Sequence, residues 1–132
     1  MTAGTEHDRE LDSDLVSIIM PTYNCGAFIA ETIATVQAQT HPRWELIVVD
    51  DCSTDDTTDV VGALAKDDPR IRYVRLETNS GAAMARNRAM ELAQGRYMAF
   101  LDSDDLWHPD KLRRQIDFMT SRGVAMSCTA YA

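Results

Sequence analysis

Residues 96–105 have the sequence RYMAFLDSDD, in which an apolar run leads directly into three carboxylates. The run Tyr97–Leu101 has the length and hydrophobicity of a strand that is buried on both faces, as in a parallel sheet. The acids Asp102, Asp104 and Asp105 follow it, and open α/β sheets bind their ligands outside the carboxyl ends of such strands. A solvated turn before a helix is the ordinary alternative for an acidic cluster. Because a buried strand precedes this cluster, we expect a parallel sheet with a cation-binding loop at one strand end.

Apolar runs of strand length alternate with helical periodicity along the rest of the chain. The expected strands are Leu15–Met20, Trp44–Asp50, Ile71–Leu76, Tyr97–Leu101 and Val124–Ala130. The expected helices carry apolar stripes at Ile29, Ile33 and Val36, at Thr57, Val60, Val61 and Leu64, at Ala85, Ala89 and Leu92, and at Leu112, Ile116 and Met119. This alternation implies an α/β fold with a mostly parallel sheet and helices on both faces. We expect the Rossmann-like strand order 3-2-1-4, in which the first and fourth strands are neighbours.

Local signals predict where two of the helices begin or end. Ser53 or Thr54 is a suitable N-cap for the second helix. The third helix is expected from about Ser80 to Gln94, with Gly95 as its stop signal.

Composition and charge limit the classes of protein to which the chain can belong. Its 132 residues, 45% of them hydrophobic, suit one globular domain over residues 15–132, and the charged residues 1–14 suit a flexible acidic leader. A formal net charge of -8 argues against a nucleic-acid partner. Three cysteines without a C-x-x-C pair indicate neither a disulfide framework nor a zinc site, which fits a cytoplasmic protein. No segment resembles a secretory signal or a membrane-spanning helix.

The expected strand order brings three polar segments to one crevice at the carboxyl edge of the sheet. They are residues 21–24 (PTYN) after the first strand, Asp50 and Asp51 after the second, and residues 102–105 after the fourth. An acidic protein that binds a phosphorylated ligand needs local positive charge, which a divalent cation held by carboxylates supplies. The sequence has neither G-x-G-x-x-G after the first strand nor G-x-x-x-x-G-K-[ST] anywhere. Their absence argues against dinucleotide oxidoreductases and P-loop NTPases.

Four segments occur together in one order: VSIIMPTYN at residues 16–24, LIVVDD at 46–51, NSG with ARN at 79–81 and 85–87, and FLDSDD at 100–105. In order and spacing they resemble glycosyltransferase family 2, whose members have the GT-A fold. The resemblance extends from Leu15 to the end of the chain. It implies an inverting, metal-dependent enzyme that takes a sugar from a nucleotide-diphospho-sugar, uses Mn²⁺ or Mg²⁺ as cofactor and acts in polysaccharide or cell-wall biosynthesis.

Carried over to this sequence, the resemblance assigns roles to eight residues. Those that bind substrate are Pro21, Thr22, Tyr23, Asp51, Arg86, Asp102 and Ser103, and those that bind the metal are Asp104 and Asp102. Tyr23 would stack on the base, and Asp51 would accept its imino hydrogen bond. A carboxylate acceptor suits uracil or thymine, and therefore a UDP- or dTDP-sugar.

The resemblance also implies separate roles for Asp102, Arg86 and Asp104. Asp102 would meet the ribose or the outer shell of the metal, and Arg86 would lie near the diphosphate or the sugar. Asp104 would ligate the metal directly. It would thereby take part in catalysis, because the cation stabilises the negative charge that develops on the leaving diphosphate.

An inverting enzyme further needs a general base that activates the acceptor hydroxyl. Family members carry this base on an acceptor-binding half that follows the acidic motif, so residues 15–132 are expected to be the donor-binding half, with the acceptor half absent. This piece alone would bind nucleotide with little or no sugar transfer. Polysaccharide, lipid-linked and protein acceptors all fit the resemblance, as does peripheral association of the full-length protein with the inner face of the cytoplasmic membrane.

Other classes share parts of the pattern. FLDSD resembles the nucleophile strand of haloacid-dehalogenase-type phosphotransferases, with Asp102 as the nucleophile and Asp104 as the acid/base. IVVDD at residues 47–51 resembles the acidic strand end of a two-component receiver domain. A non-catalytic module that binds a nucleotide-sugar is the third alternative.

Cys52 stands where the family usually has the glycine of an Asp-Gly-Ser turn. We therefore expect the backbone at Cys52 to avoid positive φ. We expect its thiol to act as a small buried hydrophobe.

Overall fold

The computed structural model describes the backbone of residues 14–122 and the side chains of residues 14–118. The expected strand Val124–Ala130 lies outside these residues, as does the expected leader apart from Asp14. Asp14 forms an ion pair with Arg43, at 2.7 Å between the side-chain atoms. The elements are β1 (Val16–Thr22), α2 (Ile29–Gln37), β2 (Trp44–Asp50), α3 (Thr57–Asp67), β3 (Ile71–Arg75), α4 (Ala82–Leu92), β4 (Tyr97–Phe100) and α5 (Lys111–Arg122).

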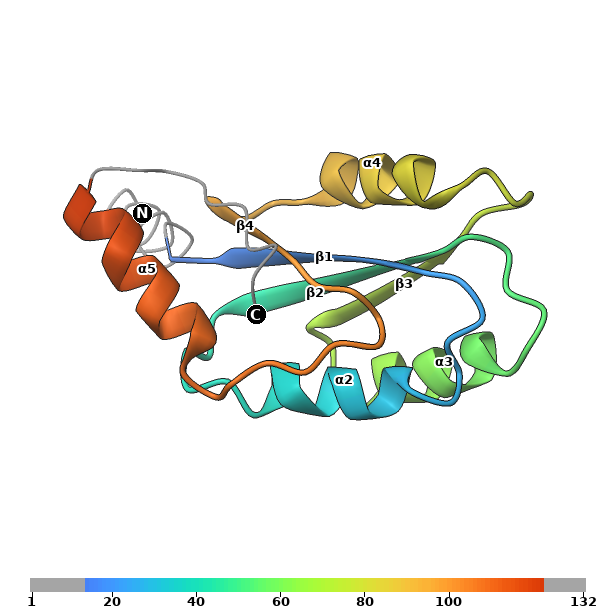
Figure 1. Ribbon diagram of the computed structural model, residues 1–132, viewed down its shortest axis with the longest axis horizontal. Coiled ribbons are helices and arrows are strands. Elements are labelled where there is room, and N and C mark those ends of the chain that lie inside the picture. The colour runs from blue at the N-terminus through green and yellow to red at the C-terminus, as the bar shows by residue number, and fades with distance from the viewer. Residues whose placement is uncertain (1–13, 123–132) are drawn as a thin grey trace, which may run out of the picture.

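The four described strands form one parallel sheet in the order β3-β2-β1-β4, which confirms the expected topology. In the register of β1 with its neighbours, Thr22 lies opposite Asp50 on β2, and Ile19 lies opposite Phe100 on β4. Because the strands are parallel, all of their carboxyl ends lie at the same edge (Figure 1). That edge therefore collects the segments that follow β1, β2 and β4.

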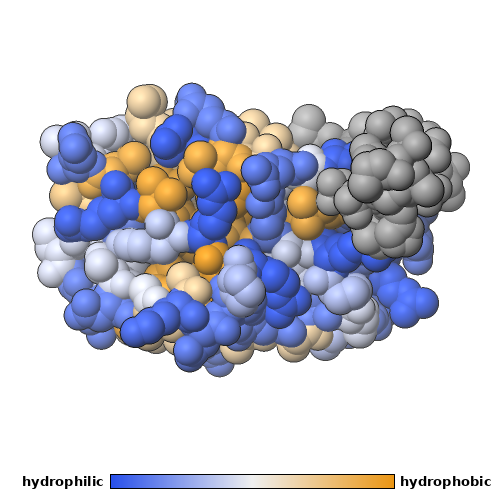
Figure 2. Space-filling model, turned by 180° about the vertical axis from the view of Figure 1, so that it is seen from behind, coloured by the Kyte–Doolittle hydropathy of each residue, from blue (hydrophilic) through white to orange (hydrophobic). Residues whose placement is uncertain are grey.

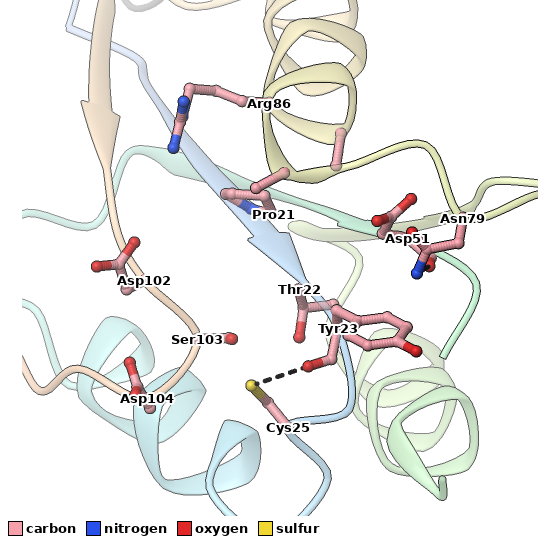
Figure 3. A pocket seen from close by; sticks show the side chains of 12 residues that line it. Pro21, Thr22, Tyr23, Cys25, Asp51, Asn79, Arg86, Asp102, Ser103 and Asp104 are labelled. Carbon is pink, nitrogen blue, oxygen red and sulfur yellow. Dashed lines mark hydrogen bonds between the residues drawn. The ribbon is translucent and has the colours of Figure 1, made fainter. Parts of the chain in front are cut away.

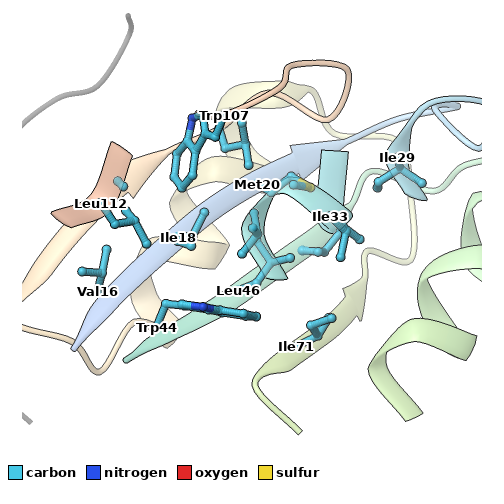
Figure 4. Packing of buried hydrophobic residues seen from close by; sticks show 14 of the residues in the cluster. Val16, Ile18, Met20, Ile29, Ile33, Trp44, Leu46, Ile71, Trp107 and Leu112 are labelled. Carbon is cyan, nitrogen blue, oxygen red and sulfur yellow. The ribbon is translucent and has the colours of Figure 1, made fainter. Parts of the chain in front are cut away.

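Helices cover both faces of the sheet, as the sequence predicts. Figure 1 shows α2, α3 and α5 on one side and α4 on the other. Successive residues of β1 alternate between the two sides, so that Ile18 and Met20 join the larger core while Ile19 joins the smaller one. The larger core, drawn in Figure 4, includes Trp44, Leu46, Trp107 and Leu112 together with the apolar faces of α2 and α3. The strands therefore read as continuous hydrophobic runs because both of their faces are buried.

The smaller core lies beneath α4. Ala85 and Ala89 are fully buried against Ile47 and Val49 of β2 and against β1. Alanines at positions i and i+4 let the helix backbone approach the sheet closely. This close approach brings the first turn of α4 to the carboxyl edge.

Two helix ends differ from the sequence-based expectations. Helix α3 begins at Thr57 with Asp56 as its N-cap residue, so neither Ser53 nor Thr54 caps it. The Ser53 hydroxyl instead donates to the buried carboxylate of Asp50, whose position the sheet sets before the helix begins. Asp55 takes over the local capping contact by accepting a hydrogen bond from the Thr57 amide at 2.9 Å.

Helix α4 spans Ala82–Leu92 rather than Ser80 to Gln94, and its C-cap is Ala93 instead of Gly95. The two residues that follow the cap are held by the sheet. The amide of Gln94 donates to Glu45 on β2 at 2.7 Å, and the amide of Gly95 donates to Ser17 on β1 at 2.8 Å. Tertiary hydrogen bonds therefore end the helix earlier than the glycine signal predicts.

The surface is mixed in character. Seen from behind, hydrophobic side chains lie between hydrophilic ones (Figure 2). Among residues 14–118, the large apolar side chains that remain exposed are Tyr23, Phe28, Met84, Leu106 and Phe118. Within the part of the chain that the structure describes, no helix has both the length and the hydrophobicity needed to cross a membrane.

Candidate nucleotide-sugar site

A cavity of about 430 Å³ opens at the carboxyl edge of the sheet. This volume lies within the range of small-molecule sites, roughly 300–1,000 Å³. Its lining residues are Pro21, Thr22, Tyr23, Cys25, Asp51, Asn79, Ala82, Ala85, Arg86, Asp102, Ser103 and Asp104. All eight residues singled out from the sequence are among them (Figure 3).

The end of β1 contributes one wall of the cavity. The β1–β4 pairing ends at Ile19 and Phe100, so Pro21, which has no amide hydrogen, lies beyond the paired region of that strand pair. Tyr23 follows the strand with 46% of its surface exposed, and its ring lies on the same side of the cavity as Asp51 and Asn79 (Figure 3). An exposed ring next to a carboxylate can stack on a flat heterocycle.

Asp51, directly after β2, is 4% exposed, and both of its carboxylate oxygens are hydrogen-bonded. One oxygen accepts from the amide of Ser80 at 2.6 Å, and the other accepts from the amide of Gly81 at 2.9 Å. The side-chain amide of Asn79 donates to the backbone carbonyl of Asp51 at 3.3 Å. Asp51 thus holds the turn that leads into α4. Since each carboxylate oxygen can accept two hydrogen bonds, capacity remains for a ligand donor.

The acidic loop after β4 forms the opposite side of the cavity. Asp102 and Asp104 are exposed and Ser103 between them is 6% exposed. Figure 3 shows both carboxylates on the side away from Asp51 and Asn79. Among residues 14–118, no hydrogen bond or ion pair engages the side chain of Asp102 or Asp104, so both remain available to a ligand.

The chemistry of these two carboxylates fits a hard divalent cation. Within the described residues no group of three or more His, Cys, Asp or Glu side chains is placed to enclose a metal ion, so a complete protein cage is not present there. Mg²⁺ characteristically binds through one or two carboxylates and completes its shell with substrate phosphates and water. Asp102 and Asp104 match the number and type of protein ligands that such a shell takes.

Arg86 supplies positive charge on the α4 side. It extends from the helix into the cavity (Figure 3), and it is the one cation among the described lining residues. A guanidinium at this place can pair with phosphate oxygens.

Four lining residues were not assigned roles from the sequence: Cys25, Asn79, Ala82 and Ala85. Asn79 and Ala85 belong to segments that the family resemblance already contains. Ala82 and Ala85 are three positions apart on α4, the spacing of neighbours on one helix face. This pair of small residues on one face was the sequence signal that could have identified them as lining residues. Cys25 carries no such signal. Its thiol donates to the carbonyl of Tyr23 at 3.4 Å, the contact marked in Figure 3.

The expectation that Cys52 avoids positive φ is wrong. Its φ is 65°, and its thiol is half-buried near the carbonyl of Glu77. The turn is held from both ends, because the amide of Ser53 donates to Asp50 at 2.9 Å and Arg75 donates to the carbonyl of Ser53 at 2.8 Å. These contacts impose the left-handed conformation on a residue that disfavours it by roughly 1–2 kcal/mol.

Asp50 lies behind the site and organises it without lining the cavity. Its buried carboxylate accepts hydrogen bonds from Ser53 and from the Tyr73 hydroxyl. The Ser53 hydroxyl in turn accepts from the amide of Asn24 at 2.9 Å, which connects the loop after β2 to the loop that carries Tyr23. Burial, with a further contribution from the Asp50 hydrogen bond, raises the pKa of Tyr73 to about 12.

The fold and this site define a class of protein. A family profile for glycosyl transferase family 2 matches residues 17–132, and the chain belongs to that family. The strand order 3-2-1-4 agrees with this, and solved structures similar to this one are GT-A glycosyltransferases.

Individual relatives match this chain over only part of their own length. The putative teichuronic acid biosynthesis glycosyltransferase TuaG of Bacillus subtilis is 56% identical over 118 residues, which are 89% of this chain and 47% of TuaG. The crystal structure of S. aureus TarS 1-349 in complex with UDP-GlcNAc matches with a TM-score of 0.77 and 35% identity, over 82% of this chain and 32% of that one. The mannosyltransferase PcManGT from Pyrobaculum calidifontis, in complex with GDP-Man and Mn²⁺, matches with a TM-score of 0.74 and 32% identity, over 79% and 32% of the two chains.

The chain thus spans about half the length of TuaG. The comparisons support neither of the aspartyl-phosphate classes nor the non-catalytic module that the sequence left open.

Proposed function

We propose that this chain binds the nucleotide-diphospho-sugar donor of an inverting glycosyltransferase, with a UDP-sugar as the favoured donor. One observation carries the proposal: a single cavity gathers an exposed aromatic ring, a buried acceptor carboxylate and two unengaged carboxylates. These groups match the three parts of such a donor, namely its flat base, the imino hydrogen of that base and its diphosphate.

Recognition of the base would involve Tyr23 and Asp51. Tyr23 would stack on the ring, and the remaining lone pairs of Asp51 would accept from N3 of uracil, which carries a hydrogen. The complex of TarS with UDP-GlcNAc supports uridine as the nucleoside. The GDP-Man complex of PcManGT makes guanosine the competitor that an experiment must include.

The diphosphate would lie between the acidic loop and α4. Asp104 and Asp102 would hold Mn²⁺ or Mg²⁺, with Asp104 as the direct ligand, and Arg86 would pair with a phosphate oxygen or the sugar. Pro21 would line the base beside Tyr23, and Thr22 and Ser103 would contact the donor as further lining residues. When bound, the cation neutralises charge on the leaving diphosphate.

Transfer to an acceptor requires groups beyond those described. We place the general base and the acceptor site outside residues 14–122, because the lining carboxylates already serve the donor. The teichuronic acid biosynthesis in the name of TuaG supports a polysaccharide acceptor, and the diphosphoundecaprenol acceptor in the name of WfaP from Escherichia coli supports a lipid-linked one. We expect the 132-residue chain to bind nucleotide with little transfer, and robust transfer by it to a hydroxyl acceptor would contradict this assignment of the base.

Calorimetric titration of UDP into the protein, with Mn²⁺ or with EDTA, tests the donor proposal. We expect Mn²⁺ to increase UDP affinity and Asp104→Ala to remove that increase. Tyr23→Ala should reduce the free energy of UDP binding under both conditions by about 1–3 kcal/mol, the usual contribution of one stacked base.

Asp105→Asn is the matched control, since Asp105 neighbours Asp104 but does not line the cavity. It should retain the metal effect. GDP and dTDP titrated under the same conditions test the base. UDP affinity that is identical with Mn²⁺ and with EDTA, or GDP bound more tightly than UDP, would refute the corresponding part of the proposal.

A further inference from the structure

Helix α2 and its C-terminal extension carry a row of polar side chains on the side that faces the core. Thr32, Thr35 and Gln39 are three and four positions apart, so they lie along one side of the helix. Thr32 is fully buried, and Gln39 is 7% exposed. Buried polar groups destabilise a protein unless they are hydrogen-bonded. All three of these side chains bond to the segment that follows β4.

The two threonines hold the first part of that segment. The Thr32 hydroxyl donates to the carbonyl oxygen of Ser103 at 3.0 Å. The Thr35 hydroxyl accepts from the amide of Trp107 at 3.2 Å, and it donates to the Thr32 carbonyl at 2.7 Å. Each hydroxyl therefore has a defined orientation.

The side-chain amide of Gln39 holds the second part. Its Nε2 donates to the carbonyl oxygen of His108 at 2.8 Å, and its Oε1 accepts from the amide of Leu112 at 3.0 Å. Together the three side chains of the row attach the connection between β4 and α5 at its start, middle and end.

This attachment matters because residues 101–110 contain neither strand nor helix. Apart from the contacts of the row, two turns order this segment: the amide of Asp105 donates to the carbonyl of Asp102 at 3.1 Å, and the amide of Lys111 donates to the carbonyl of His108 at 3.0 Å. Its end also accepts hydrogen bonds from Thr40, but residues 102–107 have no other attachment of this kind to α2 than the two threonines. Ser103 stands between Asp102 and Asp104, and its carbonyl belongs to the peptide that leads to Asp104, so the placement of that peptide affects the direction of the Asp104 carboxylate and its spacing from Asp102. The Thr32 hydrogen bond acts on that peptide group.

We propose that Thr32 is a positioning residue for the divalent cation, and that Thr35 supports it. The inference rests on the proposed function, because it concerns the cation that Asp102 and Asp104 would hold. Groups that orient metal ligands typically contribute about 10- to 100-fold to metal affinity. Thr32 does so by fixing the peptide between the two ligands before the cation and the donor arrive.

Two measurements on the 132-residue chain test this role. The first is the affinity for Mn²⁺ at saturating UDP, from the electron paramagnetic resonance signal of free Mn²⁺. Thr32→Val keeps the side-chain volume and removes the hydroxyl, and we expect it to lower the affinity for Mn²⁺ about 10-fold. The second is amide hydrogen exchange in metal-free protein, in which Thr32→Val should accelerate exchange at Asp105 and Thr35→Val at Trp107.

Three comparisons separate positioning from a general effect on the fold. Thr32→Ser keeps the hydroxyl and should restore Mn²⁺ affinity. Ile33→Val shortens a buried side chain on the same helix without removing a contact to the loop, so it should lower stability and leave Mn²⁺ affinity unchanged. Binding of uridine in EDTA should be the same in all variants, because that contact is made on the other side of the cavity.

Each outcome has a distinct meaning. Wild-type Mn²⁺ affinity in Thr32→Val, or an equal loss in Ile33→Val, would overturn the inference while leaving the proposed function intact. Absence of Mn²⁺-dependent UDP binding in the wild-type protein would refute the proposed function and this inference with it. If Thr32→Val does not fold, Thr35→Val, a change at a half-buried position, replaces it in the Mn²⁺ comparison. Thr35→Val must then lower the affinity for Mn²⁺ for the inference to stand.

Discussion

Asp51 accepts a hydrogen bond from the backbone amide of Gly81, a residue 30 positions later in the chain, at 2.9 Å. Gly81 has a φ of 99° and precedes the first residue of α4. Residues with a Cβ rarely adopt this backbone conformation, so the contact depends on glycine at this position. The pair connects the end of β2 to the start of the helix that carries Arg86, and it places two walls of the cavity relative to each other.

Replacing Asp51 with Asn tests the structural part of this contact. The amide group presents one donor where the carboxylate has only acceptors, so one of the bonds from Ser80 and Gly81 must be lost. We expect the free energy of unfolding to fall by about 1–3 kcal/mol, the cost of leaving a buried amide unpaired. Urea denaturation measures this change. Asp56→Asn, at an exposed acid with no side-chain capping bond, should change it little, and an equal loss in the two variants would contradict the interpretation.

The left-handed conformation of Cys52 predicts a stabilising substitution. Glycine adopts a φ of 65° without the steric cost that Cβ imposes. We expect Cys52→Gly to raise the free energy of unfolding by up to about 1 kcal/mol, after allowing for its greater freedom in the unfolded chain. Chemical denaturation of the reduced protein gives the value. Cys52→Ala retains the Cβ and should not stabilise, so a gain in Cys52→Ala as large as in Cys52→Gly would argue against backbone strain.

Tyr73 predicts how stability depends on pH in alkaline solution. Its pKa rises from 10.0 to about 12 on folding, chiefly through burial, so the folded protein favours the protonated phenol. The resulting stabilisation is complete below pH 10 and is lost as the pH rises toward 12. We therefore expect the stability difference between the wild-type protein and Tyr73→Phe to shrink over this interval. Urea denaturation at several pH values provides the measurement, and a difference that stays constant would show that the phenol titrates alike in both states.

Removal of the metal should separate binding of the diphosphate from binding of the base. We expect EDTA to lower the affinity for UDP and to leave the affinity for uridine unchanged, because uridine has no phosphate for the cation to contact. Fluorescence or calorimetric titration of both ligands measures the effect. Asp102→Asn should reduce the response of UDP to Mn²⁺ and leave uridine unaffected. An equal effect of EDTA on both ligands would place the cation away from the diphosphate.

Much of this architecture could be predicted from the sequence. Strands such as Trp44–Asp50 are recognisable because burial on both faces makes them continuous hydrophobic runs. The convergence of Tyr23, Asp51 and Asp104 on one cavity follows from the rule that parallel strands end at the same edge. Helix boundaries were less accurate, since Ser53 is a residue type preferred at N-caps and yet donates to Asp50.

The amino-acid order was sufficient to predict the parallel sheet, its strand order and the acids that gather at its edge. Hydrophobic periodicity identifies strands and helices locally, and parallel α/β sheets adopt few strand orders. It did not reveal that Asp51 holds the turn before α4, that Thr32 bonds to Ser103, or that Cys52 is left-handed. The first two contacts join residues 29 and 71 positions apart, and the third is imposed by the bonds of Ser53 to Asp50 and Arg75. No periodicity encodes such partnerships. They form because packing of the sheet and helices brings unpaired polar groups together, and a buried polar group without a hydrogen bond destabilises the folded protein.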